Sequence, residues 1–324
     1  QKGDLVMQTL QINQNDAGQR LDKFLQKAFP ALPSSAMYKY IRKKRIKLNH
    51  KRADISTRLQ EGDLLELYIS DDFLTPPRRE ELYKTLTPKL SVAYEDQHIL
   101  IVEKPFGLVV HEDADEQVHT LINYIKAYLY QKGDYQPHQE HSFTPALCNR
   151  IDRNTGGLVI AAKTAEGLRV MNQKIKNKEI QKQYLCIVHG TPRPKEAVLQ
   201  GYLYKDCEKN KVTVFSAPKK GAKTAVTKYR VLESKEHLSL VEITLVTGRT
   251  HQIRAHMASI GHPLLGDGKY GTNQQNKPFG ARHQALYSYR LTFCFTTPAE
   301  GLEYLNGKTV TLPHAREALG WDSL

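Results

Sequence analysis

The chain of 324 residues predicts an α+β fold with a large mixed sheet, preceded by a small separate module. From residue 90 onward, short runs alternate apolar and polar residues, which is typical of strands. Helix-period segments lie between these runs without the regular βαβ rhythm of a parallel sheet. The predicted divisions are an N-terminal extension at 1–17, a small module at 18–70, a linker at 71–89 and a large domain at 90–324.

The small module is predicted to contain two helices followed by two short strands. Apolar residues at helical spacing indicate the first helix, and they are Leu21, Phe24, Leu25 and Phe29. The segment 32–44, LPSSAMYKYIRKK, predicts a second helix that Ser34 or Ser35 can cap. Alternating residues from 45 to 69, with a Glu-Gly-Asp turn at 61–63, predict the strands.

The large domain is predicted from strand patterns separated by helical segments and by a polar loop. Strands are expected in 90–111, 157–164, 182–190, 223–234 and 238–246. Helices are expected at 120–130, 165–178 and 250–260.

The charge of the chain favours a polyanionic partner. Lys and Arg total 47 against 34 Asp and Glu, giving a net charge of +13. Such an excess attracts nucleic acids, because binding phosphates releases counterions. Eight basic residues cluster near the second helix: Lys39, Arg42, Lys43, Lys44, Arg45, Lys47, Lys51 and Arg52. They are expected to form either an RNA-binding face or a solvated charged surface.

Several other classes of protein are not indicated. No apolar stretch is long enough to span a membrane, and the N-terminus is too polar for a secretory signal. The four cysteines lie far apart without a CxxC pair, so free thiols and a cytoplasmic location are expected. His251 and His256 are five residues apart and do not share a helical face, and no phosphate-binding glycine motif occurs. Neither a metal nor a cofactor is therefore expected.

Asp152 is the first candidate catalytic residue. It lies between Arg150 and Arg153, just before a Thr-Gly-Gly turn and an apolar strand. A neighbouring guanidinium keeps a carboxylate ionised, ready to act as a nucleophile or base. The glycines Gly156 and Gly157 would permit close approach of a flat substrate. The alternative is an aspartate that hydrogen-bonds only its own turn.

Two further segments carry polar residues with chemical potential. Tyr184 lies in an apolar strand, where a tyrosine is ordinarily part of a core. Residues 246–257 pass from a glycine turn into a helix that bears Arg249, His251 and Arg254. A glycine-rich loop that contains Asp267 and Lys269 follows at 261–271.

These blocks, in their order along the chain, resemble the RluA family of RNA pseudouridine synthases. The matching blocks are EKPFGLVVH at 103–111, NRIDRNTGGL at 149–158, KQYLCIVHG at 182–190, TGRTHQIRAH at 247–256 and GHPLLGDGKYG at 261–271. Asn149 stands where His is frequent in the family, and Gly156 where Ser is frequent. The module at 18–70 is similar to the small RNA-binding module of ribosomal protein S-four. The resemblance implies the pseudouridine synthase fold, with a mainly antiparallel sheet.

The resemblance implies conversion of uridine in RNA to pseudouridine without metal or cofactor. Asp152 would be the catalytic carboxylate, through an acyl-sugar adduct or a glycal. Arg254 would pair with it, with Arg249 as second choice, and Tyr184 would stack on the uracil and could remove the C5 proton. The flipped uridine would leave a space that Arg150 fills, unless Arg150 contacts phosphate. The remaining expected substrate contacts are Arg249, His251, Lys43, Lys44 and Arg45.

The expected partner is structured RNA, with large-subunit ribosomal RNA favoured and tRNA as the alternative. No obligate protein partner is expected, and the chain is predicted to be a monomer. Two other functions remain open from the residues alone. A non-catalytic ribosome-assembly factor would need the basic module but not Asp152, Tyr184 and Arg254 together. A base-removing glycosylase would also use a carboxylate, but it would release free uracil.

Overall fold

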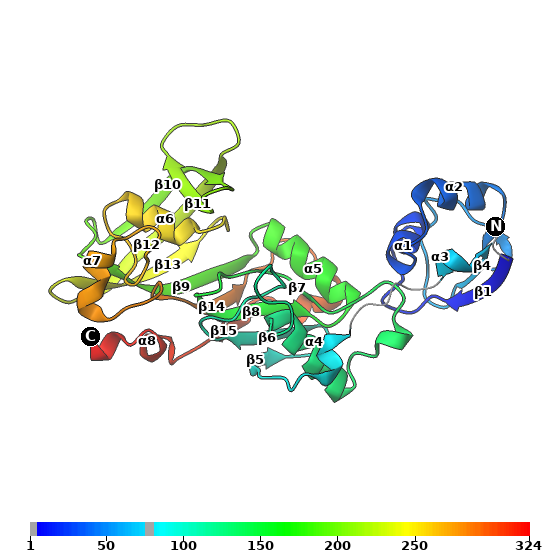
Figure 1. Cartoon of the computed structure of the whole chain (residues 1–324), viewed down its shortest axis with the longest axis horizontal. Helices are drawn as coiled ribbons and strands as arrows, with labels where there is room; N and C mark the ends of the chain where they lie inside the picture. Colours follow the sequence, from blue (N-terminus) through cyan, green and yellow to red (C-terminus); the bar gives the residue numbers. More distant parts are fainter. Residues whose placement is uncertain (1–4, 75–80) are drawn as a thin grey trace.

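The computed structural model describes residues 5–74 and 81–324, which form a small N-terminal module and a large sheet domain (Figure 1). The module has an antiparallel sheet in the order β1-β4-β2-β3. Its elements are β1 (Leu5–Gln11), α1 (Leu21–Ala28), α2 (Ser34–Arg42), β2 (Ile46–Leu48), β3 (Lys51–Arg52), β4 (Leu64–Ser70) and α3 (Asp71–Leu74). The two predicted helices are therefore present, and the sheet has more strands than the sequence predicted.

Strand β1 places residues 5–11 inside the module, whereas the sequence predicted a separate extension at 1–17. It pairs with β4 along its whole length, from Leu5 opposite Ser70 to Gln11 opposite Leu64. Without this pairing, β4 would have a row of unpaired backbone groups on one side. Residues 1–4 of the predicted extension and 75–80 of the predicted linker lie outside the described residues.

The large domain is built on one extended, mainly antiparallel sheet, so the predicted α+β class is confirmed. The strand order is β11-β10-β12-β13-β9-β14-β8-β6-β5, with β15 beside β14 and β7 beside β8. Its strands are β5 (Ser91–Glu95), β6 (Ile99–Lys104), β7 (Ala146–Leu147), β8 (Gly156–Ala162), β9 (Ile180–His189), β10 (Glu196–Asp206), β11 (Lys211–Phe215), β12 (Lys223–Ser234), β13 (Leu238–Leu245), β14 (Leu286–Phe293) and β15 (Thr309–Thr311). Within this sheet, β8 and β14 pair in parallel.

Helices lie against the sheet and in its connections (Figure 1). They are α4 (Leu121–Lys132), α5 (Ala165–Lys176), α6 (Gln252–Ser259), α7 (Asn273–Asn276) and α8 (Ala315–Ala318). Short 3-10 helices are η1 (Leu82–Thr85), η2 (Pro137–Gln139), η3 (Lys277–Phe279), η4 (Glu300–Leu305) and η5 (Trp321–Ser323). None of the helices in the described ranges has the length and apolar character needed to cross a membrane.

The alternation of side chains along the central strands produces two cores, one on each face of the sheet. On β6, Ile99 and Ile101 join one core, while Leu100 and Val102 join the other. Successive strand residues point to opposite faces, so both faces of this strand are buried. The second core also contains Tyr184, and the candidate active site lies on that face.

A loop of the small module contacts the large domain directly. The Asn15 side chain accepts a hydrogen bond from the backbone N–H of Ala165, at the start of α5 (3.0 Å). The buried Asp16 carboxylate accepts one from the Ser142 hydroxyl (2.6 Å). These bonds fix the module beside the N-terminal end of α5.

Candidate active site

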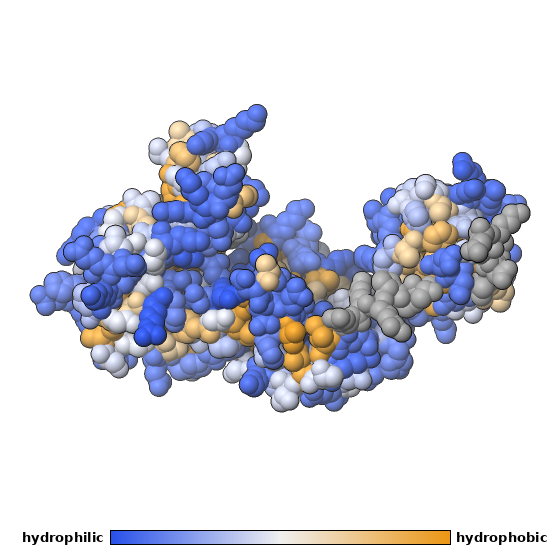
Figure 2. Space-filling model, in the orientation of Figure 1, coloured by the Kyte–Doolittle hydropathy of each residue, from blue (hydrophilic) through white to orange (hydrophobic). Residues whose placement is uncertain are grey.

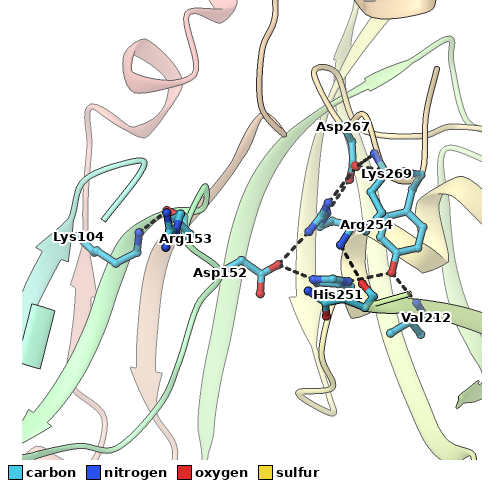
Figure 3. A network of polar contacts seen from close by, with 10 residues as sticks. Lys104, Asp152, Arg153, Val212, His251, Arg254, Asp267 and Lys269 are labelled. Carbon is cyan, nitrogen blue, oxygen red and sulfur yellow. Dashed lines mark hydrogen bonds and ion pairs between the residues drawn. The ribbon is translucent and has the colours of Figure 1, made fainter. Parts of the chain in front are cut away.

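Asp152 lies in the loop between β7 and β8, and its side chain faces α6 (Figure 3). Its carboxylate oxygen Oδ2 is 3.3 Å from Nη1 of Arg254 and 3.8 Å from Nε2 of His251. The Asp152 side chain is 33% exposed, so a substrate can reach it. Its backbone carbonyl also accepts a bond from the N–H of Thr155, closing the local turn (3.0 Å).

Arg254 is held by a second, fully buried carboxylate. Its Nε and Nη2 donate to Oδ2 and Oδ1 of Asp267 at 2.6 and 3.0 Å. The Asp267 carboxylate also accepts bonds from the backbone N–H groups of Lys269 and Tyr270. Burial alone raises the pKa of Asp267, but the bonds and charge of Arg254 outweigh burial and lower it. Arg254 is thus fixed between two carboxylates, with one N–H group directed at Asp152.

The guanidinium beside Asp152 is not one of its sequence neighbours. Arg153 turns away and pairs with Asp113 at 2.9 Å, and Arg150 is exposed. Neighbouring side chains in an irregular loop diverge, whereas α6 brings Arg254 to the carboxylate from 102 residues away. Arg249, the second choice for the ion pair, instead donates to the backbone carbonyl of Thr224 (3.2 Å).

The glycine pair after Asp152 lies where two strands of the sheet meet. Gly157 has a positive φ of 109°, and a Cβ atom there would lie 2.1 Å from the Ser288 carbonyl oxygen. A Cβ at Gly156 would lie 2.4 Å from the Tyr287 ring. Both contacts belong to β14, which pairs with β8 at this point. The glycines therefore allow the β8–β14 junction that sets the position of the Asp152 loop.

Lys104 supports the same loop from the other side (Figure 3). Its buried ammonium donates to the backbone carbonyls of Pro105, Leu108 and Arg153 at 2.9, 2.7 and 2.8 Å. Burial lowers the pKa of Lys104 to about 7, and the Asp152 charge opposes that shift. The three carbonyl oxygens accept from all three N–H groups of the ammonium, so every donor of the charged lysine has a partner.

Tyr184 lies on β9 and is only 5% exposed. Burial raises the pKa of Tyr184 to about 12, and the Asp152 charge acts in the same direction. Tyr184 is therefore a neutral phenol at physiological pH. Its face of the sheet also carries Ile151 and Ile253, the residues beside Asp152 and Arg254, in the same core.

The predicted RNA contacts of the module lie apart from this cluster. Lys43 and Lys44 are exposed just after α2, and Arg45 is half-buried. His251, predicted as a substrate contact, lies within the cluster and bonds Tyr270 through Nδ1 (2.9 Å). Within the described ranges, no three His, Cys, Asp or Glu side chains form a group able to hold a metal ion.

The sequence did not indicate Lys104 and Tyr270 as parts of the site, and it indicated Asp267 only as a polar residue of the glycine-rich loop, without a role. The sequence offered little to identify these three residues, because each lies in a segment that stood out only for its glycines or its strand pattern. Lys104 begins the KPFG turn, and the other two flank Lys269 in the loop at 261–271. Their partners are distant in sequence, or are backbone atoms that a residue pattern does not reveal.

Comparisons with known proteins agree with this architecture. A family model for RNA pseudouridylate synthase matches residues 98–259, and an S4 domain model matches residues 19–65. An uncharacterized RNA pseudouridine synthase of Mycoplasma genitalium is 34% identical over 85% of both chains. Ribosomal large subunit pseudouridine synthase C of Vibrio cholerae is 29% identical over 92% of both chains. The protein of that name from Escherichia coli is 29% identical over 90% of this chain and 89% of its own.

Solved structures share the fold of the large domain. Human RNA pseudouridylate synthase domain containing 4 matches with a TM-score of 0.54 and 20% identity, covering 71% of this chain and 93% of its own. The family and S4 matches together confirm the resemblance drawn from the sequence blocks. The chain belongs to the RluA-type RNA pseudouridine synthase family and is an isomerase of uridine in RNA with an N-terminal S4 domain.

Proposed function

We propose that Asp152 is the carboxylate that attacks the ribose, and that the substrate is a uridine in large-subunit ribosomal RNA. The proposed role of Asp152 rests on one observation: its carboxylate is both exposed to solvent and held in place by a neighbouring residue. Its carboxylate is reachable, and it pairs with an arginine that a buried aspartate holds in place. A nucleophile must be both accessible and fixed in geometry.

The proposed reaction proceeds by exchange of bonds at one sugar carbon. Asp152 attacks C1′, and the electrons of the N1–C1′ bond leave with the uracil. The detached base rotates so that C5 faces C1′; a new C5–C1′ bond forms as the carboxylate leaves. The C5 proton is lost and N1 gains a proton, so atoms and charge balance. In this scheme the hydrogen bond from Arg254 holds the Asp152 carboxylate in its orientation.

Tyr184 is proposed to stack on the detached uracil and to receive the C5 proton. Its buried position on the same face as Asp152 suits a flat base. Because its pKa is raised to about 12, Tyr184 enters as a neutral phenol. It can accept the C5 proton only as it passes its own proton on. Arg150 is exposed within the Asp152 loop, and it is proposed to fill the space that the flipped uridine vacates in the RNA or to contact phosphate.

The ribosomal target is supported by the names of the relatives and by two basic surfaces. Relatives from Vibrio cholerae and Escherichia coli are named for the ribosomal large subunit. The module carries exposed Lys43 and Lys44, and the hairpin of β10 and β11 carries further exposed lysines. The hairpin lysines are Lys205, Lys209 and Lys211, and the exposed Lys219, Lys220 and Lys223 follow in the connection to β12 and at its start. Figure 2 shows a broad hollow between the module and this hairpin, bordered by hydrophilic residues.

The decisive variant for the nucleophile is Asp152→Asn, compared with Asp113→Asn as its control. Both substitutions remove one carboxylate charge, and Asp113 pairs with Arg153 at the surface near the same loop. With RNA tritiated at uridine C5, product formation releases tritium. We expect Asp152→Asn to lose turnover while RNA affinity and thermal stability stay near wild type, and Asp113→Asn to stay active. Turnover by Asp152→Asn close to that of wild type would remove Asp152 from the mechanism.

The target is tested by mapping pseudouridine in RNA from cells lacking the protein. Cells complemented with wild type or Asp152→Asn provide the comparison. Loss of sites in large-subunit ribosomal RNA, restored only by wild type, is the expected result. Loss confined to tRNA would replace the proposed substrate while leaving the activity in place.

A further inference from the structure

Tyr270 has two hydrogen-bond partners at the edge of the active site. Its hydroxyl oxygen accepts from the backbone N–H of Val212 in β11 at 2.8 Å. The same oxygen lies 2.9 Å from Nδ1 of His251. Nε2 of His251 lies 3.8 Å from Oδ2 of Asp152 (Figure 3). A chain of polar groups therefore runs from the β10–β11 hairpin to the proposed nucleophile.

We propose that Tyr270 and His251 are positioning residues, in which the tyrosine hydroxyl fixes the histidine tautomer so that Nε2–H is directed at Asp152. This inference rests on the proposed role of Asp152. It replaces the sequence-based expectation that His251 contacts the substrate.

The donor and acceptor roles follow from the partners. The Val212 N–H can only donate, so the Tyr270 oxygen accepts there and its own hydrogen remains for another partner. His251 Nδ1 is positioned to accept that hydrogen. The opposite tautomer would leave the tyrosine hydrogen without this acceptor. It would also direct the lone pair of Nε2 toward a carboxylate, which is repulsive.

The surroundings of His251 favour its neutral form. Burial lowers the pKa of His251, and the cationic Arg254 and Lys269 act in the same direction. The carboxylates of Asp152 and Asp267 oppose this shift, but the net direction is downward. A neutral ring has only one N–H group, so the choice of tautomer decides whether Asp152 gains a donor.

The consequence concerns the two oxygens of the Asp152 carboxylate. Arg254 and His251 both approach Oδ2. Oδ1 receives no hydrogen bond from any residue in the described part of the chain. Two donors on one oxygen fix the rotation of the carboxylate and leave the other oxygen to attack the sugar. The His251 contact is too long for a hydrogen bond here, and we expect it to shorten when substrate is bound.

The histidine is held in an unusual backbone conformation. His251 has φ of 52° and ψ of 21° at the residue before α6, and its side chain does not cap that helix. This left-handed conformation is tolerated best by glycine and asparagine. The strain is consistent with a side chain that must point at Asp152. Because asparagine tolerates this backbone conformation well, substitutions of His251 can separate the role of its backbone from the role of its side chain as a hydrogen-bond donor.

The test uses His251→Gln, His251→Asn and Tyr270→Phe. A glutamine amide nitrogen can take the place of Nε2, whereas an asparagine amide nitrogen reaches only the place of Nδ1. Asparagine suits the backbone conformation better. If the Nε2 donor matters, kcat falls less in His251→Gln than in His251→Asn, even though His251→Asn is the more stable protein. Equal or better kcat in His251→Asn would overturn the inference.

Tyr270→Phe is expected to lower kcat about two- to tenfold, because only about a half to a tenth of the molecules would keep the active tautomer, with RNA affinity unchanged. Tyr229→Phe is its control, because it also removes a buried tyrosine hydroxyl bond, to the carbonyl of Pro194 (2.7 Å). Tyr229→Phe should keep kcat at the wild-type value. A loss of RNA affinity with unchanged kcat in the His251 variants would instead make His251 a substrate contact and overturn the inference.

A second measurement does not depend on catalysis. Nitrogen-15 NMR of histidine-labelled protein distinguishes the two tautomers, and the His251 signal is assigned by its absence in His251→Gln. We expect wild type to show hydrogen on Nε2 and Tyr270→Phe to show a mixture. Hydrogen on Nδ1 in wild type, or an unchanged pattern in Tyr270→Phe, would overturn the inference whatever Asp152 does. Turnover by Asp152→Asn would overturn the proposed nucleophile and leave the tautomer result standing.

Discussion

Replacing Asp267 by asparagine tests whether the orientation of Arg254 matters for catalysis. Asp267 is fully buried, and its Oδ2 accepts from Nε of Arg254 at 2.6 Å. Asparagine can keep the bonds from the backbone N–H groups of Lys269 and Tyr270 through its carbonyl oxygen. Its amide nitrogen would then face Nε of Arg254, donor against donor. Arg254 should leave this position and lose its alignment with Asp152.

The size of the effect follows from the two interactions that are disturbed. Removing one partner of a buried ion pair costs about 3–5 kcal/mol of stability. We expect about 3 kcal/mol for Asp267→Asn, the lower end, because Asp152 still offers Arg254 a partner. The bond from Arg254 to Asp152 is a hydrogen bond between charged groups. Its loss should lower kcat about ten- to hundredfold.

The control is Glu179→Gln, which breaks another buried ion pair in the same domain. Glu179 pairs with Lys174 at 3.1 Å, and both side chains are almost fully buried. It also accepts from the backbone N–H groups of Thr296 and Thr297, so the charge removed is similarly bonded. Both variants should lose stability in urea unfolding, but only Asp267→Asn should lose kcat in the tritium-release assay under folding conditions. Wild-type kcat in Asp267→Asn, or an equal loss in Glu179→Gln, would refute the reasoning.

Three other predictions concern different parts of the chain. Burial lowers the pKa of His256 to about 4 from 6.5, so the unfolded state binds more protons in that window. Acidification from pH 6.5 to 4 should therefore destabilise wild type more than His256→Asn, as measured by urea midpoints. Tyr184→Phe keeps the ring and should keep RNA affinity while slowing tritium release from C5; unchanged release would remove the phenol from proton transfer. Replacing Lys43, Lys44 and Arg45 by glutamine should reduce the slope of log affinity against log salt by about 2, and an unchanged slope would mean a solvated surface.

The fold was largely predictable because its signals are local. The predicted helix at 165–178 is α5 (Ala165–Lys176), whose first turn is capped by the Thr164 hydroxyl bonded to the N–H of Gly167. The strand predicted at 182–190 overlaps β9 (Ile180–His189), where alternate residues enter opposite cores. Strand β1 was missed because its partner β4 is more than fifty residues away, and because its sequence, LVMQTLQ, begins with three apolar residues in a row and so does not alternate.

The candidate site was predictable in its residue types but not in its contacts. Asp152 and Arg254 were proposed together from the family resemblance, and the flanking arginines were given a role that the structure assigns elsewhere. His251 was placed inside a helix, whereas it precedes α6 in a left-handed conformation. Neither a spacing of residues nor a charge pattern shows which nitrogen of a histidine faces a carboxylate. That information depends on the packing of α6 against the loop at 261–271.

Two different elements hold Asp152 in place. One fixes the backbone of its loop, and the other fixes the orientation of its carboxylate. The backbone of its loop is fixed from β6 by the ammonium of Lys104, which bonds the Arg153 carbonyl. The side chain is fixed from α6 by Arg254, which is itself anchored by Asp267. A substitution on the β6 side should therefore displace the whole loop, whereas one on the α6 side should change only the rotation of the carboxylate. The two kinds of damage differ in their effect on RNA binding, because only the loop also carries the exposed Arg150.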